Sequence, residues 1–148
     1  MPEYTQRFSE SWEVIDYYLG AAVAAATEVN TGYNVCGLYN RIVVRIHPVA
    51  LNDALDVDCE QATTAAGAGA KTLDAGAKDV TIATTDTLPT EIEIRPEEFD
   101  VTGLFDCLNI EITTANTQGG TNYFVVEILG SPRYMPAATT YVQEVNDG

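Results

Sequence analysis

FDCLNIEITTANTQGGTNYFVVEILG, the stretch from Phe105 to Gly130, decides the fold because both of its arms follow a two-residue rhythm. In the first arm Leu108, Ile110 and Ile112 share one face, as in a strand with one buried side. The second arm is apolar on nearly both faces, so we expect it to lie inside a sandwich or against a neighbouring subunit. Residues 115–122 between the arms have turn chemistry, including two glycines. The stretch therefore predicts a β-hairpin.

Short apolar runs separated by turn signals predict further strands on both sides of this hairpin. The strand predicted at Arg41–His47 should end at Pro48, because proline cannot donate to a β-ladder. Alanine-rich residues 20–26 are ambiguous, since alanine favours helix while the aromatic and β-branched residues before them favour strand. We interpret Trp12–Leu19 as a strand and the alanines as an extended or loosely turned link. The other strands are predicted at Val35–Leu38, Arg41–His47, Leu55–Gln61, Val80–Thr84 and Thr90–Arg95.

These elements predict an all-β fold, an antiparallel β-sandwich of jelly-roll type. At 148 residues the chain is long enough for one domain with a single core. We divide it into an N-terminal arm at residues 1–11, a sandwich domain at residues 12–136 and a C-terminal tail at residues 137–148. The arm is polar with few large anchors, so it should become ordered by packing on a partner.

The predicted strand Leu55–Gln61 places a row of carboxylates on one face. Asp56, Asp58 and Glu60 alternate with inward-facing apolar residues. A solvated face is the first interpretation of this row, and a calcium ion or basic residues of a partner are the alternatives. Carboxylates two residues apart lie roughly 7 Å apart along a strand, so this strand alone cannot form a compact calcium cage.

The net charge of −15 excludes several partners. Seven basic residues stand against twenty-two acidic ones, which leaves no basic cluster that could bind a phosphate backbone. We therefore expect that the protein binds neither nucleic acid nor an anionic membrane surface. We interpret the negative charge as a contribution to solubility. Residues 1–7 are polar and of mixed charge, unlike a signal peptide, so synthesis in a cytoplasm is expected.

The residues that usually carry chemistry are sparse. Cys36, Cys59 and Cys107 lie far apart without metal-ligand spacing, so we expect reduced, buried thiols. His47 is the single histidine and has neither a nucleophile nor a second ligand near it in sequence, which favours a structural or solvated role. We predict that the protein is not an enzyme and that it needs no cofactor and no metal.

Three blocks together resemble the head decoration, or cement, proteins of tailed double-stranded-DNA bacteriophages. They are EQATTAAGAGAKTL (Glu60–Leu73), TLPTEIEIRPEEFDVTGLFDCLNIEIT (Thr87–Thr113) and YFVVEILGSPRYMPA (Tyr123–Ala137), which ends in an R-Y-x-P-A pattern. The resemblance implies an antiparallel β-sandwich that binds the major capsid protein on the outside of an icosahedral head and stabilises the shell. It also implies a homo-oligomer, most commonly a trimer, located on the exterior of the virion after synthesis in the host cytoplasm.

Large apolar residues near the two ends of the sandwich are the candidate contacts. Aromatic residues in a polar arm are poor solvent-facing choices and good anchors in an interface. The competing class is a carbohydrate- or host-surface-binding β-sandwich module, in which Trp12 and the tyrosines would form a stacking platform. Aromatics in a β core or a subunit contact explain the same residues with fewer assumptions. The candidate capsid or intersubunit contacts are Tyr4, Phe8, Trp12, Tyr134 and Met135.

Overall fold

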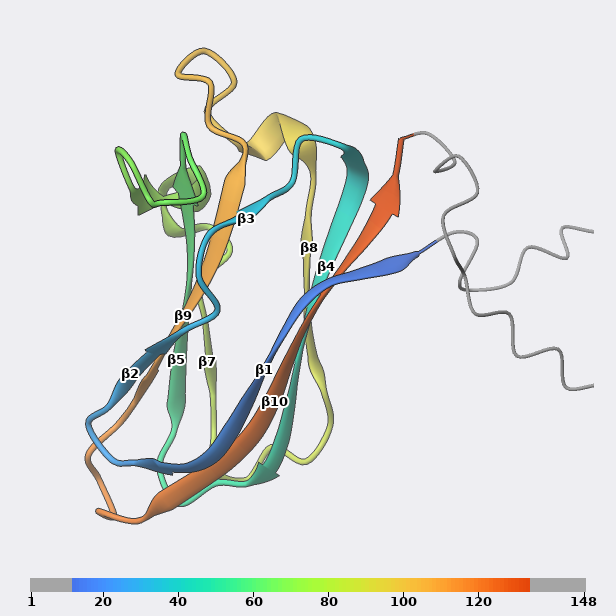
Figure 1. The fold of residues 1–148 in the computed structure, drawn as a ribbon. Coiled ribbons are helices and arrows are strands. Elements are labelled where there is room, and N and C mark those ends of the chain that lie inside the picture. Colours follow the sequence, from blue (N-terminus) through green and yellow to red (C-terminus); the bar gives the residue numbers. More distant parts are fainter. Residues whose placement is uncertain (1–11, 134–148) are drawn as a thin grey trace, which may run out of the picture.

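The computed structural model describes residues 12–133, which form two antiparallel sheets packed face to face (Figure 1). Sheet A has the strand order β1 (Glu13–Ala24), β10 (Thr121–Pro132), β4 (Tyr39–Ala50), β8 (Thr90–Ile94). In sheet B, β9 (Cys107–Thr114) pairs with β2 (Glu28–Asn30) and β3 (Asn34–Val35) on one side and with β5 (Leu55–Ala62) on the other. The outer side of β5 pairs with β6 (Lys71–Thr72) and β7 (Val80–Ile82).

The topology is that of a jelly roll. Because β2 and β3 pair with successive parts of β9, they form one interrupted edge strand, and β6 and β7 do the same along β5. Both sheets thus have four columns, and most consecutive strands alternate between them. Between residues 12 and 133 the helical segments are two short 3-10 turns, η1 (Leu73–Gly76) and η2 (Pro96–Glu98). The predicted all-β antiparallel sandwich is confirmed.

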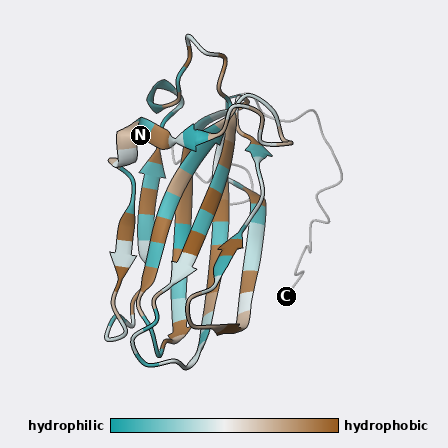
Figure 2. Ribbon diagram, turned by 90° about the vertical axis from the view of Figure 1, so that its left-hand side faces the viewer, coloured by the Kyte–Doolittle hydropathy of each residue, from teal (hydrophilic) through white to brown (hydrophobic). Residues whose placement is uncertain are grey.

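The core lies between the two sheets and follows the period of two. Hydropathic bands alternate along the strands (Figure 2), as expected when one face of each strand is buried. The predicted inward sets are confirmed: Leu55, Val57 and Cys59 of β5 are fully buried. Sheet A and β9 contribute Ile42, Val44, Ile46, Ile92, Ile94, Phe124, Val126, Ile128, Leu108, Ile110 and Ile112.

The hairpin predicted for Phe105–Gly130 is wrong. β9 and β10 do not pair with each other, because β9 lies inside sheet B and β10 inside sheet A. Residues 115–120 instead carry the chain across the sandwich. The facing of the residues was nevertheless predicted correctly, since alternation depends only on the strand itself, whereas the partner of a strand depends on where the loop leads.

The crossing is held by the buried carboxylate of Asp53. Its Oδ1 accepts hydrogen bonds from the backbone amides of Thr117 (3.0 Å) and Gln118 (2.8 Å), and Asn122 donates to Oδ2 at 3.4 Å. The Asn122 side chain also accepts from the amides of Asn52 and Asp53, both at 2.9 Å. The amide hydrogen bonds, above all that from Gln118, lower the pKa of Asp53 to about 2. The turn-like sequence 115–122 therefore makes an inter-sheet loop that one anion organises.

The strand predicted at Trp12–Leu19 is present but longer, because β1 continues to Ala24 through a bulge between Gly20 and Val23. Ala22 has a φ of 53°, which suits a bulge with small side chains. A Cβ at Gly20 would stand 2.7 Å from the ring of Phe124, so only glycine leaves room for that core side chain. The alanine run is thus not a helix: its residues to Ala24 extend β1, and Ala25 and Ala26 form the turn that follows, so only the last part of the predicted link lies outside the strand.

The prediction that Pro48 ends its strand is also wrong. β4 runs through Pro48 to Ala50, and Pro48 lies opposite Phe124 of β10. On its other side β4 is paired with β8 only from Ile42 to Ile46. At Pro48 that side is an edge, where a missing N–H costs little. The predicted strand at Val35–Leu38 is shorter than expected, because β3 ends at Val35 and a turn follows.

Ile110→Asp should lower the free energy of unfolding by several kcal/mol, about 3–5, because it places an unpaired charge in the core. Glu111→Lys, one residue further on the opposite face, is the matched control and should have little effect. Urea denaturation of both variants measures the difference. Equal shifts of the two midpoints would contradict the facing of β9.

Asp53→Asn should destabilise the protein at pH 7, because a neutral amide oxygen binds the amides of Thr117 and Gln118 more weakly than a carboxylate does. Its NH2 group would also face the Asn122 Nδ2 donor that now binds Oδ2. The folded-state pKa of about 2 lies below the ordinary value of 3.8, so this stabilisation is present above about pH 4. It is lost as the pH falls from about 4 towards 2. Denaturant curves across this range should show the gap between wild type and variant closing; a gap that stays constant would contradict the assignment.

Candidate interaction surfaces

The outer face of sheet A carries an exposed apolar strip, formed by Val14, Tyr17, Leu19 and Tyr123. Their exposed fractions are 58%, 63%, 61% and 41%. Tyr18, between two of them on β1, faces inward and packs beside Phe124 with a ring separation of 6.1 Å. Because strand residues alternate, burying Tyr18 forces Tyr17 and Leu19 into solvent. Large apolar side chains gathered on one outer face are typical of a contact surface.

The same face carries ion pairs that neutralise its charges. Arg45 pairs with Glu91 at 2.9 Å, and Arg41 pairs with Glu93 at 2.6 Å. His47 Nε2 lies 2.9 Å from Glu127 Oε2 on the neighbouring strand, with both side chains about one-third exposed. The predicted structural or solvated role of His47 agrees with this placement.

The outer face of sheet B is acidic. Asp58 on β5 stands directly opposite Glu111 on β9, an arrangement in which like charges repel. Residues 12–133 contain no ion pair with any carboxylate of this face. The predicted outward row of β5 is thereby confirmed and extended to six residues, which we name the acidic face: Glu28, Asp56, Asp58, Glu60, Asp79 and Glu111.

Burial and mutual repulsion act together on this face. Partial burial, followed by the charges of neighbouring carboxylates, raises the pKa of Asp58 and of Glu111 above their ordinary values. Hydrogen bonds hold other members: Tyr33 donates to Glu60 at 2.7 Å, and Thr81 donates to Asp56 at 2.8 Å. In the described part of the chain, no group of three or more His, Cys, Asp or Glu side chains is arranged to hold a metal ion.

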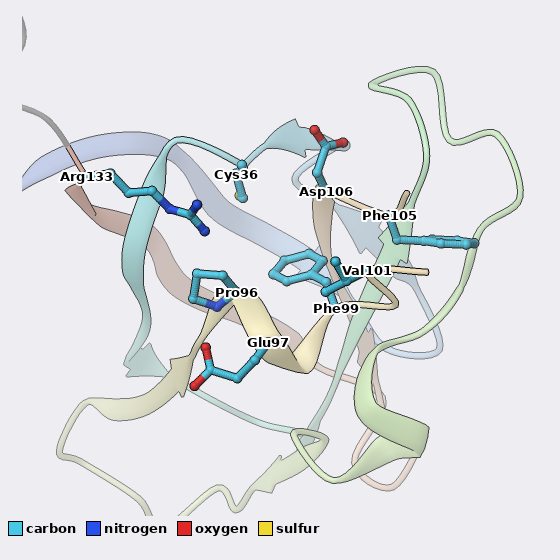
Figure 3. A pocket seen from close by; sticks show the side chains of 9 residues that line it. Cys36, Pro96, Glu97, Phe99, Val101, Phe105, Asp106 and Arg133 are labelled. Carbon is cyan, nitrogen blue, oxygen red and sulfur yellow. The ribbon is translucent and has the colours of Figure 1, made fainter. Parts of the chain in front are cut away.

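A cavity of about 400 Å³ opens at the end of the sandwich beside η2 (Figure 3). Phe99 is almost fully buried beneath it, whereas Val101 on its wall is 65% exposed. The guanidinium of Arg133 points into the hollow, and Glu97 and Asp106 lie on opposite sides of it. An apolar floor with a few charged groups at the rim is the usual composition of a ligand or side-chain pocket.

The three cysteines are free and buried, as predicted. Cys36 reaches the wall of the cavity, but burial raises the pKa of its thiol to about 12, and it does the same for Cys59. Burial and the neighbouring Asp106 raise the pKa of Cys107 to about 11. Since the thiolate is the nucleophile, none of these groups is prepared for covalent chemistry at neutral pH.

Of the predicted contact residues, only Trp12 lies in the described part of the chain. It precedes β1 and is partly buried, with Arg41 Cζ 5.7 Å from its ring centroid. The guanidinium over the ring makes a cation–π contact, so Trp12 is held against sheet A. Tyr4, Phe8, Tyr134 and Met135 lie outside the described residues.

Sequence reasoning missed the apolar strip. The signal was present in the alternation of Tyr17, Tyr18 and Leu19, but it could not reveal which of the two faces is the inner one. The acidic face was found only in its β5 row, because Glu111 joins that row through strand pairing and not through sequence proximity.

No protein-family model and no curated protein matches the chain. No helix within residues 12–133 is long and apolar enough to cross a membrane.

Glu111→Gln should raise the free energy of unfolding at pH 7 by up to about 1 kcal/mol, because it removes one of two opposed carboxylates. Since the folded-state pKa of Glu111 is raised, the repulsion acts above that pKa and disappears as the pH falls below its ordinary value of 4.5. Thermal unfolding at pH 7 and pH 3.5 measures both effects. Glu97→Gln, on an unopposed carboxylate, is the control, and a Glu111→Gln variant less stable than wild type at pH 7 would contradict the prediction.

Proposed function

We propose that this protein is a structural virion protein, a cement protein that binds the outside of an icosahedral phage head and stabilises the shell. The observation that carries the proposal is the contrast between its two outer faces. Sheet A offers an apolar strip among charges that are already paired, whereas sheet B offers six carboxylates with no ion-pair partner within residues 12–133. A decoration protein needs one face for the shell and one for water.

The architecture and the sequence resemblance support the same proposal. Jelly rolls are common in viral capsid domains, although they also occur in lectins, so the fold alone is an analogy. The three blocks that resemble head decoration proteins include β8 and most of β9 and β10, which supply core residues to both sheets. Their resemblance supports a homo-oligomer, with a trimer as the expected form, and the major capsid protein as partner.

Stabilisation of the shell requires no chemistry. A subunit that bridges neighbouring shell proteins adds its binding free energy only to the intact shell, so the shell is favoured by linkage. An oligomer repeats each weak contact around its axis, and avidity makes the assembly bind strongly. The acidic face turned to solvent would keep decorated particles apart by charge repulsion.

A carbohydrate-binding module is the second candidate, favoured by the exposed rings of Tyr17 and Tyr123 on one face. Leu19 shares this strip, and apolar side chains contact protein surfaces more readily than they bind hydroxylated sugars. Binding to a glycan array that is lost in Tyr17→Ala, without binding to heads, would favour this second candidate.

Leu19→Lys should weaken attachment to heads at least about tenfold, because it places a charge in the centre of the apolar strip. Thr113→Lys makes the same charge change on sheet B and is the control. Co-sedimentation of each variant with heads of the phage that encodes the chain measures the affinity. The proposal fails if wild-type protein does not sediment with heads, and the assignment of the binding face fails if both variants bind like wild type.

A further inference from the structure

The cavity beside η2 is left unfilled by the side chains of residues 12–133. Its floor is Phe99, and its wall includes the exposed Val101, a residue whose side chain a partner could cover. Neither Glu97 nor Asp106 has an ion-pair partner within residues 12–133. Arg133, whose guanidinium points into the hollow, supplies one cation against these two carboxylates. A matching occupant therefore has an apolar side chain for the floor and one further cation next to it.

The chain itself contains such a segment in its N-terminal arm. Within residues 1–11 the sequence Arg7-Phe8 places a guanidinium directly beside an aromatic ring, and Arg7 is the only basic residue of the arm. Tyr4 is the other aromatic residue and has no basic neighbour. Fully extended, an arm of this length reaches about 35 Å, which is enough to leave one domain and contact another.

We propose that the cavity receives Phe8 from the N-terminal arm of a second copy of this chain, with Arg7 beside the carboxylates of Glu97 and Asp106. The ring fills the hollow over Phe99 and Val101, and burial of a large aromatic side chain supplies most of the affinity. The two carboxylates orient the arm, because they attract a guanidinium and repel the acidic residues elsewhere on the protein.

This contact explains how copies would assemble. Each copy has one arm and one cavity, so the contact is heterologous and joins copies head to tail. A heterologous contact closes into a ring when its rotation allows, and a ring of three agrees with the expected trimer. Trp12 fixes the root of the arm, since Arg41 holds its ring against sheet A. The apolar strip lies on another surface and stays available for a shell.

The test uses the full-length protein without heads, so its result is independent of the capsid proposal. Phe8→Ala removes the anchor, and Val101→Arg fills the cavity and repels Arg7. Each variant alone should associate at least about tenfold more weakly than wild type in analytical ultracentrifugation. Tyr4→Ala and Leu104→Arg are the matched controls, since Leu104 is a 78% exposed residue of the same loop outside the cavity lining. Both controls should assemble like wild type.

Mixing the two variants gives the decisive result. A Val101→Arg subunit still has an arm, and a Phe8→Ala subunit still has an open cavity, so the mixture should form a one-to-one heterodimer. In a fluorescence anisotropy titration, the two variants should bind each other at least about tenfold more tightly than either binds itself. A monomeric wild type, unchanged assembly of Phe8→Ala, or a mixture that associates no more tightly than its components would each overturn the proposal.

Discussion

The carboxylate of Asp53 holds the point on which the topology depends. It receives the amides of Thr117 and Gln118 where the chain leaves β9 in sheet B and enters β10 in sheet A. Both strands are interior members of their sheets, so this single crossing places the middle of one sheet behind the middle of the other. A buried anion satisfied by backbone amides is stable only while those amides converge, so it specifies one path for the loop.

Once β9 and β10 lie in opposite sheets, the character of the two outer faces follows. The inward residues of each strand fill one core, and the residues between them face outward because side chains alternate along a strand. On sheet A these outward positions hold Tyr17 and Leu19, and on sheet B they hold Asp58 and Glu111. The two outer faces of the sandwich therefore differ in chemistry: one is partly apolar and the other is acidic.

The long edge strand β1 shows how such a protein limits unwanted association. An unpaired edge beside an apolar strip would favour sheet-to-sheet aggregation. Two bulges interrupt the register of β1 with β10, and Asp16 accepts a hydrogen bond from Asn34 of sheet B at 2.9 Å. Bulges and charged residues at an edge both oppose strand addition. The outer face of sheet A and the cavity at the end of the sandwich are the surfaces that the two proposals assign to association.

The sequence by itself determined the strands and their inner faces, because alternation is a local property that any strand expresses in its own residues. Leu55, Val57 and Cys59, and likewise Leu108, Ile110 and Ile112, were predicted inward and are buried. Only the tertiary structure decided that β9 and β10 lie in different sheets, that Pro48 stays within β4, and that Glu111 faces Asp58. The cavity likewise joins Cys36, Glu97 and Arg133 from distant parts of the sequence. Such pairings are non-local, since they depend on which surfaces meet when the core closes, and no pattern within one strand records its neighbour.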